Sequence, residues 1–263
     1  MLFGEGQISV GCEEMTVNEQ ENGFIGGDFD SDPRRRLLLR ALAAGALVGG
    51  SGWAQADTFG AVPHRLPAGK SIFEIDGRVR VNGQRANRDT LIKPGDVIET
   101  DSDGKLVGVI GADALIIRPN SRVEIGGAAG VARSFFRLVS GAMLSVFGKR
   151  DDVYEIHMPV ATIGIRGTGV YTEADADKSY VCLCYGTAAL TPLSRPEQQK
   201  LLTTRHHDAP MFLYKDAVEG SCMQPAPFYN HTDLELMALE ALVGRKVPFA
   251  VAEDPYASPR REY

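Results

Sequence analysis

The sequence predicts an all-β domain, built from short strands as a solenoid or sandwich and followed by one C-terminal helix. From Ser71 to Leu190, short apolar stretches alternate with turns rich in Gly, Pro and Asp. No helical period of apolar residues occurs between residues 71 and 190. The chain also contains 29 glycines without a repeat, which is typical of many tight turns between strands.

Alternation and turn residues predict the strands in order. Residues 77–83 alternate apolar and polar side chains between two glycines, the pattern of a half-buried strand. Lys93–Asp96 is a turn, because Pro presets φ and Gly accepts a positive φ. After it we expect strands at residues 97–100, 106–110, 114–117, 153–158 and 179–185, and two strands within 136–146 around Ser140-Gly141.

The C-terminal helix is predicted over residues 233–243. Thr232 and Glu235 have the spacing of a capping box, in which the two side chains bond reciprocal free amides. Leu236, Leu239 and Leu242 lie on one face, and Gly244 ends the helix. We expect this face to dock on the β domain; the alternative is a helix that binds a partner.

Residues 1–56 are predicted to be a polar leader followed by a signal peptide. Arg35-Arg36-Leu37-Leu38-Leu39-Arg40 is similar to the twin-arginine consensus, with Leu for Phe and Arg for Lys. A weakly apolar stretch follows, and Ala54 and Ala56 form the small-x-small pattern of a cleavage site. We therefore expect delivery to the periplasm of a Gram-negative bacterium through the export translocase.

Two alternatives to this route are a Sec signal and an uncleaved anchor. An anchor needs about 20 apolar residues, and the stretch after Arg40 is short and Gly-rich, so no lasting membrane span is expected. Met15 is an alternative start to Met1 and would delete Cys12. Twin-arginine substrates cross the membrane folded, which favours a metal or cofactor inserted beforehand.

Composition excludes one class of partner. The chain has 263 residues, a net charge of −6 and 44% apolar residues, so it can bury a core. Nucleic-acid binders normally carry a basic face, so no nucleic-acid partner is expected.

Four motifs resemble the FecR-domain family in order and spacing. Leu91–Thr100 resembles its "L-x-x-G-D-x-I-x-T" opening, and Leu115–Ser121 is similar to the next strand pair. Phe136–Gly141 resembles the "L-x-x-G" step, and His157–Val170 is similar to the "T-P-x-A…R-G-T-x-F" core. The resemblance covers residues 71–190 and implies a FecR-like β domain there.

The family's reference protein regulates ferric-citrate uptake across the membrane and has a cytoplasmic anti-sigma region. Only about thirty polar residues precede the arginines here, too few for that region. The resemblance therefore implies the periplasmic binding module and not the transcriptional role. Residues 191–263 are predicted to be a C-terminal extension.

Gly164–Gly169 contains three glycines and invites comparison with nucleotide-binding loops. Such loops need a following helix or a Gly-Lys-Ser/Thr sequence, and here a strand continues through Thr172. The glycines are instead predicted to permit a bulge or a close strand approach. For Arg166 we favour an ion pair with an acidic side chain over contact with a ligand anion.

Cysteines and histidines gather at and beyond the end of the resemblance. Cys182 and Cys184 lie two apart on a predicted strand and so point to the same face. An extended pair of this kind is poorly placed for a mutual disulfide, so one of them could bond Cys222 in an oxidising compartment. One alternative is a metal site for Zn, Cu or Fe. The other is that these residues form neither a disulfide nor a metal site. The candidate ligands are Cys182, Cys184, His206, His207, Cys222 and His231.

No catalytic arrangement stands out. No serine sits in a nucleophile elbow. Cys184 with His206 is the one cysteine–histidine pair that we take as a candidate for a thiol-dependent enzyme. We expect a binding or sensing module whose partner is an envelope protein or a small ligand. The alternative is a protein that carries a metal or cofactor in the Cys/His cluster, and a thiol-dependent enzyme ranks third.

Overall fold

The structure is a computed structural model that describes residues 63–127, 135–150 and 154–249. The predicted signal residues Arg35, Arg36, Ala54 and Ala56 lie outside these ranges, as does Cys12. None of the helices in the described residues is long and apolar enough to span a membrane.

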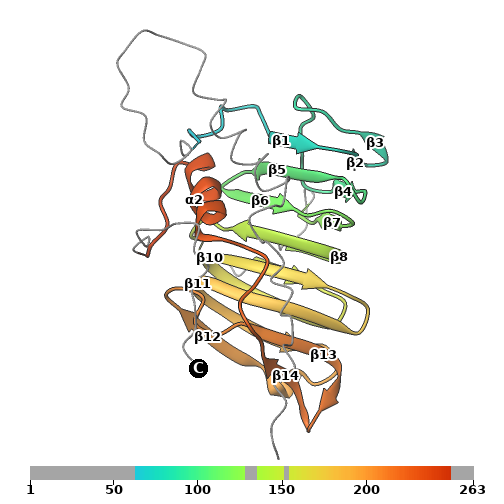
Figure 1. Ribbon diagram of the computed structural model, residues 1–263, viewed down its shortest axis with the longest axis vertical. Coiled ribbons are helices and arrows are strands. Elements are labelled where there is room, and N and C mark those ends of the chain that lie inside the picture. The colour runs from blue at the N-terminus through green and yellow to red at the C-terminus, as the bar shows by residue number, and fades with distance from the viewer. Residues whose placement is uncertain (1–62, 128–134, 151–153, 250–263) are drawn as a thin grey trace, which may run out of the picture.

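The fold is all-β, as predicted, with one sheet of 14 strands and a C-terminal helix in the described residues. Figure 1 shows the strands stacked along the long axis, from β1–β3 at one end to β13 and β14 at the other. The strands are β1 Ile72–Asp76, β2 Val79–Val81, β3 Gln84–Arg85, β4 Val97–Thr100, β5 Lys105–Ile110, β6 Asp113–Ile117, β7 Arg122–Ile125, β8 Phe135–Val146, β9 Tyr154–His157, β10 Ala161–Ala174, β11 Lys178–Pro192, β12 Lys200–Thr204, β13 Met211–Val218 and β14 Ser221–Pro225. A 3-10 turn, η1, spans Pro196–Gln198, and helix α2 spans Asp233–Leu242.

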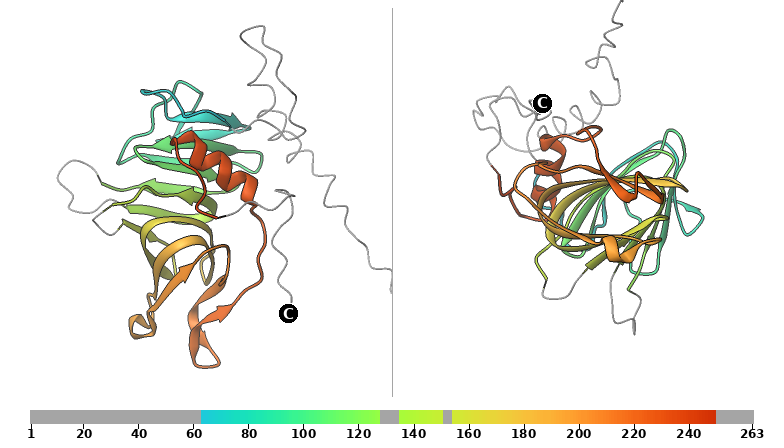
Figure 2. Two further views of the ribbon diagram at one scale, coloured as in Figure 1. Left: turned by 90° about the vertical axis from the view of Figure 1, so that its left-hand side faces the viewer. Right: turned by 90° about the horizontal axis from the view of Figure 1, so that it is seen from below.

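The sheet is mixed and curls about its long axis (Figure 2). Strands β8 and β9 are parallel, and the other pairings found among the described strands are antiparallel. The central hairpin β10–β11 pairs with β8, β9, β12 and β13. Strands β12–β14, all in the C-terminal extension, thus join the same sheet through β11.

The two faces of the sheet bury two separate cores. The larger one contains Ile98, Phe136 and Leu183 on the inner face of the curl. The second core lies between the other face and α2, and includes Tyr180 and Leu239. Because side chains alternate along β11, Val181 and Leu183 enter the first core while Cys182 and Cys184 enter the second.

The expectation of two strands around Ser140-Gly141 was wrong. Strand β8 is continuous from Phe135 to Val146. Gly141, with a φ of 85°, lets β8 leave β7 and pair with β6 without ending. A Cβ at Gly141 would lie 2.2 Å from Oγ of Ser121, so the close approach requires glycine.

The glycines of residues 164–169 do lie within a strand and next to a bulge. The β10–β11 register shifts between Arg166 and Gly169, and Gly167 has a φ of 57°. The side chain of Arg166 is exposed and takes part in none of the ion pairs found within the described residues. The predicted acidic partner of Arg166 is therefore not seen there.

Helix α2 begins and ends close to its predicted limits. The capping box is present, with Thr232 accepting from the Glu235 amide and the Glu235 side chain accepting from the Thr232 amide. Gly244, with a φ of 73°, follows the helix. The apolar face of α2 packs against β6 and β8 (Figure 2), which confirms docking on the β domain.

Candidate metal site

Strand β11 places two thiols side by side beneath α2. Cys182 and Cys184 are fully buried and point to the same face, as their spacing predicts. The Sγ of Cys184 donates to the backbone oxygen of Cys182 at 3.6 Å. Both sulfur atoms thus lie in the core between the sheet and the chain that leads into α2.

The turn after β12 brings His207 to these thiols. The backbone amide of His207 donates to the oxygen of Cys184 at 2.9 Å. The carboxylate of Asp208 closes the turn by accepting from the Arg205 amide at 2.8 Å. His207 is buried, with a φ of 53°, and its Nδ1 lies 3.3 Å from Sγ of Cys182.

The segment before α2 supplies His231 from the opposite side. Its ring stacks on Tyr171 with 4.5 Å between centroids, and the residue is buried. Nδ1 of His231 lies 2.8 Å from the backbone oxygen of Tyr229. A carbonyl oxygen only accepts, so Nδ1 carries the hydrogen and the lone pair of the neutral ring is on Nε2. That nitrogen lies 3.1 Å from Nδ1 of His207.

Asp233, the first residue of α2, orients the ring of His207. Its Oδ1 lies 3.1 Å from Nε2 of His207, and both of its oxygens contact Nε2 of His206 at 2.9 and 2.8 Å. The pKa of Asp233 would rise on burial, but the hydrogen bonds from the two histidines hold it below its ordinary value. As a carboxylate it accepts from Nε2–H of His207 and leaves the lone pair of the neutral ring on Nδ1.

Two imidazole lone pairs and a thiol therefore converge on one point. Lone pairs on His207 Nδ1 and His231 Nε2 repel each other unless a proton or a metal ion lies between them. The ligand atoms of Cys182, Cys184, His207 and His231 all lie within 4.8 Å of one another. Ligands of tetrahedral zinc, with bonds of about 2.0–2.3 Å, lie about 3.3–3.8 Å apart, so small side-chain shifts would close the set around an ion.

The electrostatics of the group favour the ligand form of one thiol. Burial raises the pKa of Cys182, but hydrogen bonds from Cys184, His207 and His231 outweigh it and bring the pKa well below its ordinary value. The pKa of Cys184 is well above its ordinary value because of burial and the neighbouring sulfur of Cys182. Burial lowers the pKa of His207, and hydrogen bonds to Asp233 and Cys182 raise it by more.

An ion pair behind the site fixes the start of α2. Arg118 contacts Glu235 at 2.9 Å and also donates to the oxygen of Asn230 at 3.0 Å. Burial would raise the pKa of Glu235, but attraction to Arg118 holds it below the ordinary value. These contacts anchor the residues on either side of His231 to the sheet.

The structure brings four of the six predicted ligands together and places the other two elsewhere. His206 belongs to a neighbouring group with His207 and Asp233. Cys222 lies on β14, where its Sγ is 3.5 Å from Oγ of Ser194 and its amide donates to Gln198. Cys182, Cys184 and Cys222 are free thiols, so the disulfide considered for Cys222 is not formed in this structure.

Sequence reasoning missed Asp233, which it treated as the first helical residue alone. The signal that could have found it is an acidic residue two positions after a candidate ligand histidine, at a helix start. The candidate pair for a thiol-dependent enzyme was Cys184 with His206. Cys184 is fully buried within the four-residue group, whereas His206 lies at the edge of that group with 30% of its side chain exposed.

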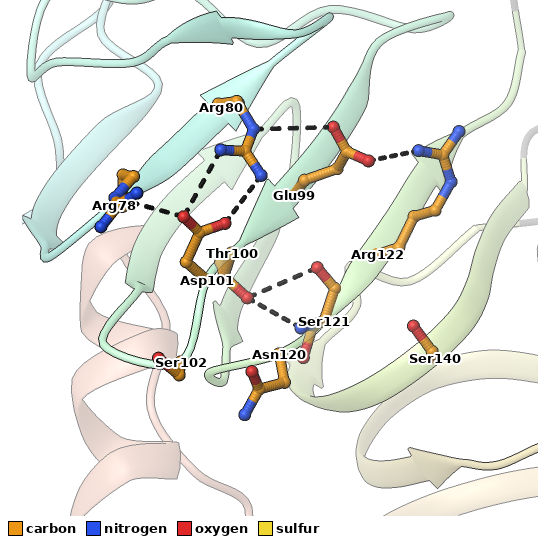
Figure 3. A pocket seen from close by; sticks show the side chains of 10 residues that line it. All are labelled: Arg78, Arg80, Glu99, Thr100, Asp101, Ser102, Asn120, Ser121, Arg122 and Ser140. Carbon is orange, nitrogen blue, oxygen red and sulfur yellow. Dashed lines mark hydrogen bonds and ion pairs between the residues drawn. The ribbon is translucent and has the colours of Figure 1, made fainter.

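A second polar region, a cavity of about 660 Å³, lies on strands β2, β4 and β7 (Figure 3). Its charged side chains pair with each other across the strands. Asp101 contacts Arg80 at 2.7 Å and Arg78 at 3.2 Å, and Glu99 contacts Arg122 at 2.5 Å. Because Arg80, Glu99 and Arg122 occupy opposing positions in the register, this is a cross-strand charge ladder. Each charge already has a partner of opposite sign, so the ladder explains the cavity without a ligand.

Comparisons with known proteins found distant structural similarity alone. No family model matches it, and no curated protein matches it. Two crystal structures of a candidate anti-sigma factor from Parabacteroides distasonis ATCC 8503, at 2.50 and 1.65 Å resolution, are similar to it. Each has a TM-score of 0.41 and 8% identity, over 49% of this chain and 58% of that one. The chain thus spans less than two thirds of that protein, and its function has to be sought in its own side chains.

Proposed function

We propose that this chain is an exported, FecR-like protein that holds a metal ion in the Cys182, Cys184, His207 and His231 site. The single observation that carries the proposal is the arrangement of the two histidines. Each turns one nitrogen to the thiols and donates from the other to a fixed acceptor, Tyr229 or Asp233. Metal-ligating histidines in proteins are held in this way.

The chemistry of the ligands favours zinc. Two thiols and two imidazoles in a tetrahedral set suit Zn²⁺, with an iron–sulfur centre or Cu(I) as competitors for soft ligands. The four residues are at most 3% exposed, and so no coordination position faces solvent. A closed site of this kind is structural rather than catalytic. It would clamp the turn after β12 and the start of α2 to β11, so metal occupancy would control the order of this face.

The FecR-like role and the periplasmic location are part of the same proposal. They are supported by the four motifs in residues 91–170 and by Arg35-Arg36 with Ala54 and Ala56. Export in the folded state fits a thiol-rich site, because the metal can be inserted in the reducing cytoplasm before oxidation competes. The partner would be an envelope protein or a small ligand.

Metal content measured on protein purified from the periplasm tests the site. We expect one metal per chain in the wild type and in Cys222→Ser, and none in Cys184→Ser. Cys184 and Cys222 are a matched pair, because both thiols are fully buried and free and only Cys184 belongs to the cluster. Circular dichroism checks that each variant is folded.

Cobalt loading gives a readout that needs no variant. Thiolate-to-metal charge transfer and the visible bands of tetrahedral Co²⁺ should appear in the wild-type spectrum. Metal-free protein with three reactive thiols and no cobalt spectrum would overturn the metal site. Export is tested separately by changing Arg35 and Arg36 to Lys, which should leave uncleaved protein in the cytoplasm.

A further inference from the structure

A second pocket lies beside the metal site and shares none of the four ligands. It has a volume of about 620 Å³, within the range of about 300–1,000 Å³ of small-molecule sites. Aromatic rings from three segments contribute to its wall, namely Phe147, Tyr185 and Phe249. Phe249 packs on His206 with 4.3 Å between centroids and faces Tyr185 at 5.8 Å, so the rings of Phe249 and Tyr185 form a shared apolar surface at this wall.

Cations dominate the polar part of this pocket. Lys149, Arg205, Arg245 and Lys246 line it, and Glu240 is the acidic residue among the described residues of its lining. Glu240 is already occupied, since it accepts from Tyr185 Oη and from Arg245 Nε. In the described part of the chain, none of the ion pairs involves Lys149, Arg205 or Lys246. Among the described residues, these three cations of the pocket thus have no acidic partner, unlike the cations of the ladder in Figure 3.

Two further features favour a bound anion. Nη2 of Arg245 is buried and has no hydrogen-bond partner among the described residues, so this guanidinium has a donor that none of them accepts from. Gly167 and Gly186, both with positive φ, also line the pocket and leave it without side chains there. A Cβ on Gly186 would lie 2.7 Å from Cγ2 of Thr168, so the backbone approaches closely at this wall.

We infer that this pocket binds a small organic anion with an aromatic body, of the aromatic carboxylate class. The aromatic rings supply offset or edge contacts to a flat ring. The cations of Lys149, Arg205 and Lys246 supply charge-assisted hydrogen bonds to a carboxylate. The inference does not depend on the metal site, because it uses none of the metal ligands.

Binding of 2-naphthoate to the full, folded protein tests the inference, with two matched probes. The neutral isostere 2-naphthamide removes the charge, and acetate removes the ring. Isothermal titration calorimetry should give a Kd for 2-naphthoate at least about tenfold below that for 2-naphthamide. Acetate should bind too weakly to measure.

Variants of the exposed cations locate the site. Arg205→Gln and Lys246→Gln should each weaken 2-naphthoate about three- to tenfold and leave 2-naphthamide unchanged. The Arg205 change keeps its turn, since it is the backbone amide that donates to Asp208. Lys200→Gln on β12, an exposed lysine outside the pocket, is the matched control and should change nothing. Equal affinities for the acid and the amide, an effect of Lys200→Gln as large as that of Lys246→Gln, or no binding of 2-naphthoate would overturn the inference.

Discussion

The charge ladder of Figure 3 and the Cys/His cluster are both polar groups gathered on the sheet, and they differ in what their atoms face. In the ladder, Arg122 and Glu99 meet as opposite charges with 41% and 31% of their side chains exposed. In the cluster, electron-pair donors meet each other with at most 3% exposure of each residue. The first arrangement is satisfied by the protein alone, whereas the second needs a proton or a metal ion between its electron-pair donors. The two regions should therefore respond very differently to the removal of one component.

Removal of the metal should have the largest effect. An ion present at a thousand times its Kd stabilises the fold by about 4 kcal/mol, which corresponds to about 8–16 °C in Tm for a domain of this size. We expect a strong chelator to lower the Tm of the wild type by this amount, measured by calorimetry.

The same chelator should leave the Tm of Cys184→Ser unchanged and should lower that of Cys222→Ser as in the wild type. If the chelator lowered the Tm of all three proteins equally, the stabilising metal ion would have to bind outside the Cys/His cluster.

Loss of the carboxylate of Glu235, behind the site, should have an effect of comparable size. Glu235→Gln leaves Arg118 as a charge without its ion-pair partner, which typically costs about 3–5 kcal/mol at a buried pair. Because the pKa of Glu235 in the folded chain is below its ordinary value of 4.5, its contribution is fully present above that pH and is lost as the pH falls below it.

Urea unfolding at pH 7 and at several pH values below 4.5 should show the gap between wild type and Glu235→Gln closing with acid. Exposed Glu197→Gln on η1 is the control and should show no such gap. Because the wild type and Glu235→Gln are compared at the same pH, a loss of metal that affects both proteins cancels from the difference in their free energies of unfolding. A gap that stays constant down to the lowest pH would contradict the ion-pair account.

Asp233→Asn should weaken metal binding without abolishing it. Partners that orient a ligand histidine contribute about 10- to 100-fold to metal affinity, and the amide of Asn can present a nitrogen to His207 where the carboxylate presents an oxygen. Competition with a chromophoric chelator measures the affinity. Asp216→Asn, an exposed carboxylate on β13, should match the wild type; an equal loss in both would remove Asp233 from the site.

The ladder should give the smallest effect. Arg122→Gln removes an exposed pair, and such pairs contribute about 0–1 kcal/mol. The midpoint of urea unfolding should shift correspondingly little, and added salt should reduce the shift further. A loss above about 2 kcal/mol would show that the ladder is more than a surface network.

Local patterns in the sequence predicted those features that depend on neighbouring residues. The capping box of Thr232 and Glu235 was predictable because a helix start is settled within one turn. The shared face of Cys182 and Cys184 was predictable because a strand has a side-chain period of two. The bulge near Gly167 followed from glycines within a strand pattern.

Other features needed the fold. Residues 136–146 were predicted as two strands, because a sequence pattern cannot distinguish a turn at Gly141 from a bend at which a strand changes partners. The sequence left Cys222 as a disulfide partner for Cys182 or Cys184, whereas in the fold Cys222 contacts Ser194 and Gln198 instead. The sequence did not predict that Asp233 orients His207, because a carboxylate at a helix start is already explained by its favourable interaction with the helix dipole.

The sequence by itself thus determined the all-β class, the docked helix and the residue types from which a metal site could be built. The tertiary structure alone decided which of them meet. The register of β11 with β12 brings His207 to Cys182, and the docking of α2 brings His231 and Asp233 to His207. These contacts span more than twenty residues of chain, and they depend on strand pairing and core packing that no local pattern encodes.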